Sequence, residues 1–247
     1  MTNIARAYDQ IASWYDSFYG GRLDLNEDRL VSAMLRGYTG GQVVDLGCGT
    51  AHALSLDGLD SDRYTGIDIS PKMLEQARRK WPDARFCLQD MQATSIEEGT
   101  VDNVISLYGS FSYARYPMRV VDEIYRLLTE GGRFFVMAYA QGHRHKKRYC
   151  LADRPEARCL WRQWDLYRLF VSNFARVQVR PFSYRELPDW IPPLWYQWID
   201  RALGLTIPDE ATFHIVTGQK VTNYAYSEVL SNRQRIRCGP RPVCEAL

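Results

Sequence analysis

Features that mark several classes of protein are missing from this chain of 247 residues. None of its six cysteines stands in a Cys-x-x-Cys pair, so neither a zinc site nor a disulfide framework is indicated, and we expect free thiols and no bound metal. No apolar run approaches the ~18 residues of a membrane span, and no basic-then-apolar signal begins the chain, which predicts a soluble cytoplasmic protein. The formal net charge of only +2 provides no overall field that would attract nucleic acid.

A glycine-rich turn follows the first apolar run of the chain. The run from Gln42 to Leu46 continues into Gly47-Cys48-Gly49-Thr50-Ala51-His52, which is typical of a buried parallel strand that turns into a helix. Glycines let the backbone bend tightly and let a ligand lie against it, although Gly-x-Gly alone also occurs in ordinary turns. A dinucleotide loop has a third glycine where this chain has His52. Asp45, just before the loop, would oppose a pyrophosphate and favour a cationic group.

Two further acids follow the next predicted strands. The segment Arg63 to Asp68 is predicted to be a short strand, and Ser70-Pro71 has the pattern of an N-cap and first turn of a helix. Asp68 at the end of that strand can accept hydrogen bonds from both ribose hydroxyls, the alternative being an ordinary surface aspartate. A third strand, Ala84 to Gln89, leads into Asp90-Met91. Asp90 is expected beside Asp68, where it can accept from an adenine amine while Met91 packs on the ring.

Four motifs in this order resemble those of a known family. The segments Asp45 to Thr50, Asp68-Ile69-Ser70, Gln89-Asp90-Met91 and Leu127 to Phe134 are similar to successive motifs of class I S-adenosylmethionine-dependent methyltransferases. The resemblance implies a Rossmann-like α/β fold: a seven-stranded, mostly parallel sheet with an antiparallel last strand and helices on both faces. It also implies S-adenosyl-L-methionine as the cofactor. Ala51 departs from the family, which commonly has a third glycine there.

The resemblance also implies which residues hold the cofactor. Tyr15, followed by Asp16, resembles a tyrosine that closes over the methionine end of the cofactor, the alternative being a buried aromatic residue. Leu107 should offer a backbone contact to the cofactor's amino group. The complete expected set is Tyr15, Asp45, Gly47, Cys48, Gly49, Asp68, Ile69, Met73, Asp90, Met91 and Leu107.

The chain is expected to form a single methyltransferase domain over residues 1–220, with a helical cap at 1–40, an aromatic insert at 183–211 and a C-terminal tail at 221–247. Aromatic residues of the insert either bind a ligand or pack the insert onto the sheet edge. Further helices are predicted at Ile4 to Tyr19, Asn26 to Arg36, Met118 to Leu128 and Trp164 to Asn173. Further strands are predicted at Asp102 to Leu107, Arg133 to Ala140 after a Gly131-Gly132 turn, Arg176 to Phe182, and Thr212 to Lys220.

The methyl acceptor is the open question of the sequence. Methyl transfer depends mainly on holding donor and acceptor at near-attack distance, and a base is required only if the acceptor must lose a proton. Tyr108, His143 and His145 are candidates for that base by location alone. We expect a small-molecule acceptor of aromatic or apolar character, because the insert is aromatic and the charge is balanced.

Two other functions remain open. A basic run from Gly142 to Arg148 and the arginines of the tail (Arg233, Arg235, Arg237 and Arg241) would suit an RNA or protein methyltransferase. The third hypothesis is a cofactor-binding fold diverted to chemistry other than methylation. Nothing in the sequence indicates an oligomeric state.

Overall fold

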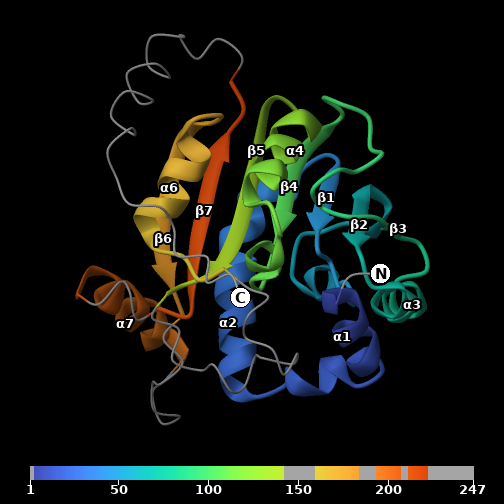
Figure 1. Ribbon diagram of the computed structural model, residues 1–247. Coiled ribbons are helices and arrows are strands. Elements are labelled where there is room, and N and C mark those ends of the chain that lie inside the picture. Colours follow the sequence, from blue (N-terminus) through green and yellow to red (C-terminus); the bar gives the residue numbers. More distant parts are fainter. Residues whose placement is uncertain (1–2, 142–158, 184–192, 207–210, 222–247) are drawn as a thin grey trace.

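A seven-stranded sheet organises the residues that the computed structural model describes, which are 3–141, 159–183, 193–206 and 211–221 (Figure 1). The strands are β1 (Val43–Leu46), β2 (Tyr64–Asp68), β3 (Arg85–Leu88), β4 (Val101–Ser106), β5 (Leu128–Tyr139), β6 (Ala175–Phe182) and β7 (Phe213–Gln219). The α-helices are α1 (Asn3–Ile11), α2 (Arg22–Leu35), α3 (Pro71–Lys80), α4 (Pro117–Leu127), α6 (Gln163–Val171) and α7 (Pro193–Thr206). Short 3₁₀ helices are η1 (Tyr15–Phe18), η2 (Arg36–Tyr38), η3 (His52–Ser55), η4 (Ser61–Arg63) and η5 (Ser110–Tyr113).

The strands lie in the order β3-β2-β1-β4-β5-β7-β6. Strands β1 to β5 pair in parallel, whereas β7 runs antiparallel to both β5 and β6. The fold class implied by the family resemblance is therefore confirmed. Strands β2 and β3 lie on one side of β1, whereas β4 and β5 lie on its other side. A crevice is therefore expected between β1 and β4 at their carboxyl ends.

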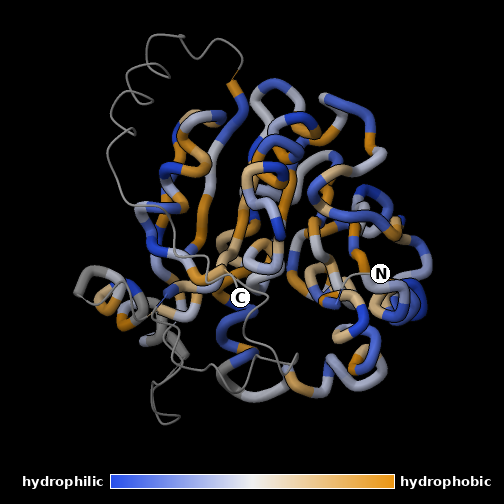
Figure 2. The backbone as a smooth tube through the Cα atoms, in the orientation of Figure 1, coloured by the Kyte–Doolittle hydropathy of each residue, from blue (hydrophilic) through white to orange (hydrophobic). Residues whose placement is uncertain are grey.

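Helices cover both faces of the sheet, and a hydrophobic core lies under each. On one face Val31 and Leu35 of α2 and Leu74 of α3 pack with sheet residues such as Ile105 and Phe135. On the other face α4 and α6 bury their apolar sides against the strands. Figure 2 shows the hydrophobic residues concentrated along the strands, and charged or polar ones on the outer sides of the helices. Since both faces of the central strands are buried, their sequences are mostly apolar, although β1 contains Asp45 and β4 contains Asp102 and Asn103.

The predicted cap helix from Ile4 to Tyr19 is wrong in its extent. Helix α1 ends at Ile11, and Tyr15–Phe18 form the separate 3₁₀ helix η1. The second predicted helix begins earlier than expected, at Arg22, where the side chain of Asp24 accepts a hydrogen bond from the backbone N–H of Gly21. Figure 1 places α1 near α3 at the carboxyl-terminal edge of the strands.

The predicted Gly131-Gly132 turn is also wrong, because β5 runs through both glycines. Gly131 has a φ of 79°, and the neighbouring pairing with β4 contains an irregularity. Backbone hydrogen bonds to Lys220 at the end of β7 hold both glycines in the sheet. The pair therefore belongs to a continuous strand, since the N–H of Gly131 and the carbonyl of Gly132 both bond to the backbone of Lys220.

The aromatic insert contains a helix, α7, that the sequence did not predict. Trp195 and Trp198 of this helix are exposed. The remainder of the insert, at 184–192 and 207–210, lies outside the described residues, as do the basic run Gly142 to Arg148 and the tail from residue 222. Among the helices that the structure describes, none is long and apolar enough to span a membrane.

Candidate functional site

The loop after β1 is held in a tight conformation at the carboxyl edge of the sheet. The backbone N–H groups of Gly47 and Cys48 both donate to the carbonyl of Ile67, at 2.8 and 3.0 Å. Gly47 has a φ of 79°, and a Cβ atom there would lie 2.5 Å from Cβ of Ser110. Gly49 also has a positive φ, and a Cβ there would meet no atom within 4 Å. The loop thus needs glycine at position 47 for packing, and leaves open space at position 49.

Ala51 shares this left-handed conformation, with a φ of 58°. L-residues other than glycine adopt it at some cost, which explains why the related family commonly has glycine there. The alanine is fully buried and precedes η3, so the surrounding packing holds it in place.

Asp68 is oriented by the loop and by the start of α3. Its Oδ2 accepts from the N–H of Gly49 at 2.9 Å, and its Oδ1 accepts from the N–H of Ser70 at 2.8 Å. Burial raises the pKa of the Asp68 carboxyl group, while the backbone hydrogen bonds from Ser70 and Gly49 act in the opposite direction. A carboxylate has about four acceptor sites, so both oxygens can accept further hydrogen bonds from a ligand.

Asp45 is a second carboxyl group at this edge, and it is only 2% exposed. Its Oδ2 accepts from the hydroxyl of Tyr64 at 2.7 Å, whereas its Oδ1 is buried with no hydrogen-bond partner among the described residues. Burial raises the pKa of Asp45 to about 7, with the Tyr64 hydrogen bond lowering it and the nearby Asp68 raising it. A buried acceptor without a partner suits a cationic or hydrogen-donating ligand.

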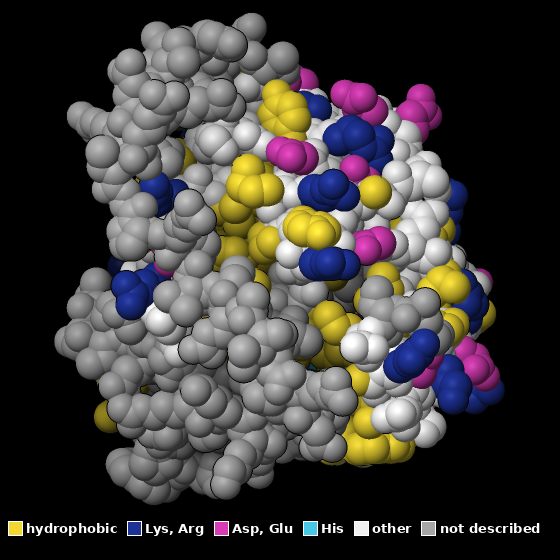
Figure 3. Space-filling view, viewed as in Figure 1, with side chains coloured by type: hydrophobic (Ala, Val, Ile, Leu, Met, Phe, Trp, Pro, Cys, Tyr) yellow, Lys and Arg dark blue, Asp and Glu magenta, His cyan; other side chains and the backbone are white. Residues whose placement is uncertain are grey.

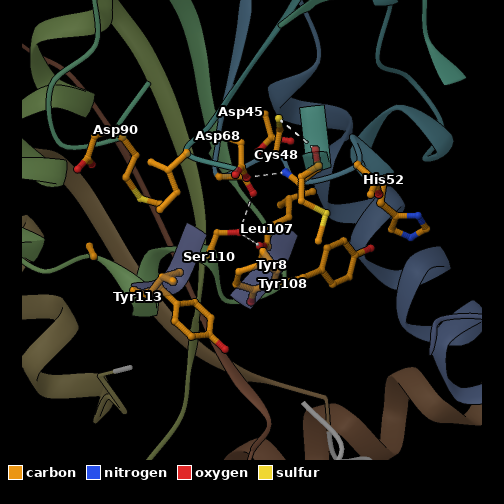
Figure 4. A pocket seen from close by; sticks show the side chains of 18 of the residues that line it. Tyr8, Asp45, Cys48, His52, Asp68, Asp90, Leu107, Tyr108, Ser110 and Tyr113 are labelled. Atoms are coloured by element: carbon orange, nitrogen blue, oxygen red, sulfur yellow. Dashed lines mark hydrogen bonds between the residues drawn. The ribbon is translucent and has the colours of Figure 1, made fainter. Parts of the chain in front are cut away.

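These groups line a cavity of about 1040 Å³, which counts the part open to solvent. Figure 4 shows Asp45, Asp68 and Cys48 gathered at one side of it, with Asp90 farther along the wall and Tyr108 and Tyr113 opposite. The structure brings to this one cavity all of the residues predicted to hold the cofactor: Tyr15, Asp45, Gly47, Cys48, Gly49, Asp68, Ile69, Met73, Asp90, Met91 and Leu107. Asp90 is exposed, and both of its carboxylate oxygens accept from the side-chain amide of Gln92.

The N-terminal segment is attached to the cavity by two aspartates. Asp9 of α1 accepts from the hydroxyl of Ser70 at 2.6 Å and from the N–H of Lys72 at 3.1 Å. Asp16 of η1 accepts from the hydroxyl of Thr50 at 2.6 Å and from Lys80 at 2.8 Å. The first helices therefore lie against both the glycine loop and the start of α3.

The loop after β4 forms the opposite wall of the cavity. The hydroxyl of Ser110 donates to the carbonyls of Gly47 and Leu107, at 2.8 and 3.1 Å. Tyr108 has a φ of 51°, a strained value for a residue with a side chain, and Gly109 after it has a φ of 86°. A Cβ at Gly109 would lie 2.5 Å from the ring of Tyr139, so only glycine fits there.

A second cavity of about 800 Å³ adjoins the first. Tyr15, His52 and Tyr108 line both cavities. The Nε2 atom of His52 lies 3.0 Å from Oδ2 of Asp28, and the hydroxyl of Tyr108 donates to Oδ1 of the same carboxylate at 2.5 Å. Asp28 belongs to α2, so this contact joins the cap to the wall between the two cavities.

Tyr108 is therefore the one base candidate that the structure places at the site, because His143 and His145 lie outside the described residues. Sequence reasoning missed His52 and Asp28. It considered His52 only as an obstacle to a pyrophosphate, and Asp28 lies 24 residues earlier on a helix whose orientation the sequence does not reveal.

The sequence of this chain is similar to those of known methyltransferases. The family model described as "Methyltransferase domain" matches residues 43–132. A demethylmenaquinone methyltransferase of Symbiobacterium thermophilum is 32% identical over 190 residues, covering 69% of this chain and 70% of that protein. A malonyl-[acyl-carrier protein] O-methyltransferase of Pectobacterium atrosepticum is 29% identical over 56% of this chain. The chain spans about half the length of several such curated relatives, 52% for the Pectobacterium protein and 53% for its Serratia marcescens counterpart.

Solved structures share the fold. A putative methyltransferase of Haloferax volcanii, in a complex with the Trm112 methyltransferase activator, superposes with a TM-score of 0.64. It is 22% identical, with 87% of this chain and 97% of that chain covered. A Thermotoga maritima protein, titled as a possible histamine N-methyltransferase, gives a TM-score of 0.63 at 16% identity, over 88% and 100% of the two chains.

Proposed function

Because the chain belongs to the class I S-adenosylmethionine-dependent methyltransferases, we propose that it transfers a methyl group to an oxygen, nitrogen or carbon nucleophile of a small molecule. One observation carries the proposal: the cavity at the carboxyl edge of β1, β2 and β4 combines the glycine loop with the buried carboxyl groups of Asp45 and Asp68. When bound, S-adenosyl-L-methionine supplies an electrophilic methyl group on a positively charged sulfur.

The residues present fit this cofactor. The buried Oδ1 of Asp45 has no described hydrogen-bond partner, which suits a ligand that carries an ammonium and a sulfonium charge. The open space beside Gly49 lets a ligand approach the backbone closely.

Each part of the cofactor has a proposed set of contacts. Asp68 accepts from the ribose hydroxyls through the acceptor sites that Gly49 and Ser70 leave unused. Asp90 and Met91 hold the adenine at the other end of the cavity. The carbonyl of Leu107 and the ring of Tyr15 lie at the methionine end.

Methyl transfer by this site rests on positioning. The sulfonium charge is dispersed rather than created as the methyl group moves, so the chain gains most by fixing the two reactants at near-attack distance. Tyr8, Tyr15 and Tyr113 line the cavity and contact one another edge-on, with ring centroids 6.0 Å apart for Tyr8–Tyr15 and 5.9 Å apart for Tyr8–Tyr113. These rings exclude water from the space in front of the methyl group.

A small-molecule acceptor is supported by two observations. Relatives named for the small acceptors trans-aconitate and demethylmenaquinone cover 62% and 69% of this chain, whereas one named for an eEF1A lysine covers 41% and one named for a tRNA nucleoside covers 58%. On the face shown in Figure 3, acidic and basic side chains are interspersed over the described residues, without the single-sign surface that a nucleic acid prefers.

Titration calorimetry with S-adenosyl-L-methionine tests the proposal. Asp68→Ala should weaken binding by about 1 to 3 kcal/mol, or roughly 5- to 150-fold, because the ribose hydroxyls lose their charged acceptor. Asp83→Ala removes an exposed aspartate next to β3 and serves as the matched control with unchanged affinity. Thermal unfolding of both variants separates lost binding from a disturbed glycine loop. An unaltered affinity in a folded Asp68→Ala protein would refute the assignment.

A further inference from the structure

We propose that His52, positioned by Asp28, is the base that removes a proton from the acceptor, and that the acceptor is therefore a group that must lose a proton, such as a hydroxyl, an ammonium or an acidic carbon, rather than a carboxylate. The inference rests on the proposed methyltransferase function and goes beyond it, because it assigns the base and the chemical class of the acceptor. The observation behind it is the contact of His52, Asp28 and Tyr108 on the wall shared by the two cavities.

The location of His52 gives it access to both reactants. It begins η3 directly after the glycine loop, and it lines both the cavity proposed for the cofactor and the second cavity. Its side chain is 35% exposed, so it is neither a core residue nor a free surface group. Figure 4 shows the imidazole beyond the phenol ring of Tyr108, at the edge of the cofactor cavity. An acceptor in the second cavity would meet this imidazole on its way to the methyl group.

The contact with Asp28 determines which ring nitrogen of His52 can accept a proton. With Nε2 3.0 Å from Oδ2 of Asp28, the neutral imidazole is held with its proton on Nε2, because the carboxylate only accepts. The lone pair is then on Nδ1, which lies 3.1 Å from the hydroxyl of Ser55. The hydroxyl of Ser55 donates to the backbone carbonyl of His52 at 2.6 Å, so its proton does not occupy the Nδ1 lone pair.

Tyr108 completes the arrangement by donating to the other oxygen of Asp28 at 2.5 Å. The ring of Tyr108 lies 5.4 Å from the ring of His52, centroid to centroid. The strained backbone of Tyr108 directs this hydroxyl, and strain of that kind is retained where a precise placement is used. Asp28 is therefore a positioning residue with both oxygens engaged.

The step conserves atoms and charge. The attacking atom of the acceptor forms a bond to the methyl carbon while the bond between that carbon and the donor sulfur breaks, leaving its electron pair on sulfur. The acceptor proton passes to Nδ1 of His52. The resulting imidazolium is paired with the Asp28 carboxylate, and it returns its proton to solvent after the product leaves.

The acceptor class follows from this chemistry. A carboxylate has no proton to lose at neutral pH, so a base would add nothing to its methylation, whereas phenols, alcohols, ammonium groups and acidic carbons need one. The second cavity is also lined by four acids, Asp16, Asp24, Glu27 and Asp28, against a single described lysine, Lys80. Lys80 is already paired with Asp16 at 2.8 Å. An anionic acceptor would meet like charge there.

Nitrogen-detected NMR of the histidine rings tests the arrangement in the intact protein without any acceptor. His52 is assigned by its loss in His52→Gln, and spectra are recorded with bound S-adenosylhomocysteine at a pH where imidazole is neutral. The proposal predicts the Nε2–H tautomer in the wild type and a larger Nδ1–H fraction in Asp28→Ala, which removes the acceptor for Nε2–H. A wild-type Nδ1–H tautomer, or a tautomer insensitive to Asp28→Ala, would overturn it.

Activity measurements test the acceptor class with benzoate, phenol and benzylamine as probes and labelled S-adenosyl-L-methionine as donor. Phenol or benzylamine should be methylated in preference to benzoate. His52→Ala should lower kcat about 10²- to 10⁴-fold with little change in donor affinity, and added imidazole should restore part of the loss. Arg79→Gln, on the exposed side of α3, is the matched control. Preferred methylation of benzoate, or a His52→Ala protein that keeps the wild-type kcat, contradicts the proposal.

Calorimetry of the wild type separates the role of His52 from the methyltransferase function itself. If the wild type does not bind S-adenosyl-L-methionine in calorimetry, the methyltransferase assignment itself fails. If the wild type binds it and the tautomer or the acceptor preference is wrong, only the role of His52 and Asp28 fails.

Discussion

Asp45 combines two properties that conflict in the free protein. It is buried at the end of β1, and it is also the carboxyl group that we propose for a cationic ligand. Burial disfavours its charged form and raises its pKa to about 7, so a charged Asp45 destabilises the ligand-free fold at neutral pH and above. This residue is expected to favour binding at the expense of stability.

Asp45→Asn should therefore make the ligand-free protein more stable than the wild type at alkaline pH. Because the folded pKa is raised, the contribution of Asp45 to the stability of the wild type is greatest below the unfolded value near 4 and declines as the pH rises to about 7. The advantage of the variant should grow by about 2 to 4 kcal/mol over that interval. Urea unfolding at several pH values measures it, with the exposed Asp83→Asn as control. A difference independent of pH would exclude the burial argument.

The sequence predicted these residues unequally. Asp45, Asp68 and the glycines were found because they lie within a few positions of strand ends, where a local motif determines which edge they reach. His52 and Asp28 were not found as a pair, since their contact depends on how α2 packs beside the glycine loop. Packing between distant elements leaves no local pattern in the sequence.

At the scale of elements, the N-terminal cap is the part most directly connected to ligand binding. Asp9 of α1 and Asp16 of η1 bind the start of α3 and the glycine loop. Tyr8 and Tyr15 from the same segment line the cavity. The cap thus covers the site through a few polar contacts and a small apolar cluster around Ile11.

Hydrogen exchange should show residues 3–25 becoming more protected when S-adenosyl-L-methionine binds. The physical reason is that a bound ligand adds contacts to Tyr8 and Tyr15 and reduces local opening of a segment with few buried contacts. Asp16→Asn, which weakens the links to Thr50 and Lys80, should raise exchange there without ligand. The exposed pair Glu75 and Arg79 offers a control in Glu75→Gln. Equal exchange with and without ligand would show that the cap is not a lid.

A second connection joins the loop after β3 to α4. Glu123 accepts from the N–H and the hydroxyl of Thr94 at 2.8 and 2.6 Å, and Arg126 donates to both of its oxygens. Burial alone would raise the pKa of Glu123, but the hydrogen bonds from Arg126 and Thr94 outweigh it and lower that pKa. This loop continues from Asp90 and Met91, so the connection stabilises one end of the cavity.

Glu123→Ala should destabilise the fold by about 1 to 3 kcal/mol, because Thr94 and Arg126 lose their acceptor. Since the folded pKa of Glu123 is lowered, its contribution is present above the unfolded pKa and is lost as the pH falls through the folded value. Chemical unfolding at neutral and acidic pH should therefore show the variant and the wild type converging in acid. A constant gap at all pH values would contradict this account.

The elements themselves were largely predictable from the sequence. All seven strands were expected near their observed positions, because each is a short apolar run bounded by turn residues. The exceptions have physical causes. The glycine pair at 131–132 resembles a turn but is kept in β5 by backbone hydrogen bonds to Lys220, which directly follows β7. Helix α7 begins at Pro193, a residue that favours the first turn, yet the neighbouring prolines concealed it.

At the scale of the whole molecule, the sheet order places the site. Strands β1 and β4 are neighbours although β2 and β3 lie between them in the chain, and the crevice this creates is filled by the glycine loop and the loop after β4. Helix α1 and the start of α2 lie below the carboxyl ends of the strands in Figure 1. The cavity that we propose for the cofactor thus arises from the sheet topology, whereas the adjoining cavity is lined mostly by residues of the N-terminal segment.

A crystal structure with bound S-adenosylhomocysteine tests the central claim most directly. The account predicts the ribose hydroxyls on the carboxylate of Asp68, the adenine beside Asp90 and Met91, and the amino acid end near Leu107 and Tyr15. The sulfur should face the wall formed by Tyr108 and His52. A nucleoside bound elsewhere, or bound in the reverse direction along this cavity, would contradict the account.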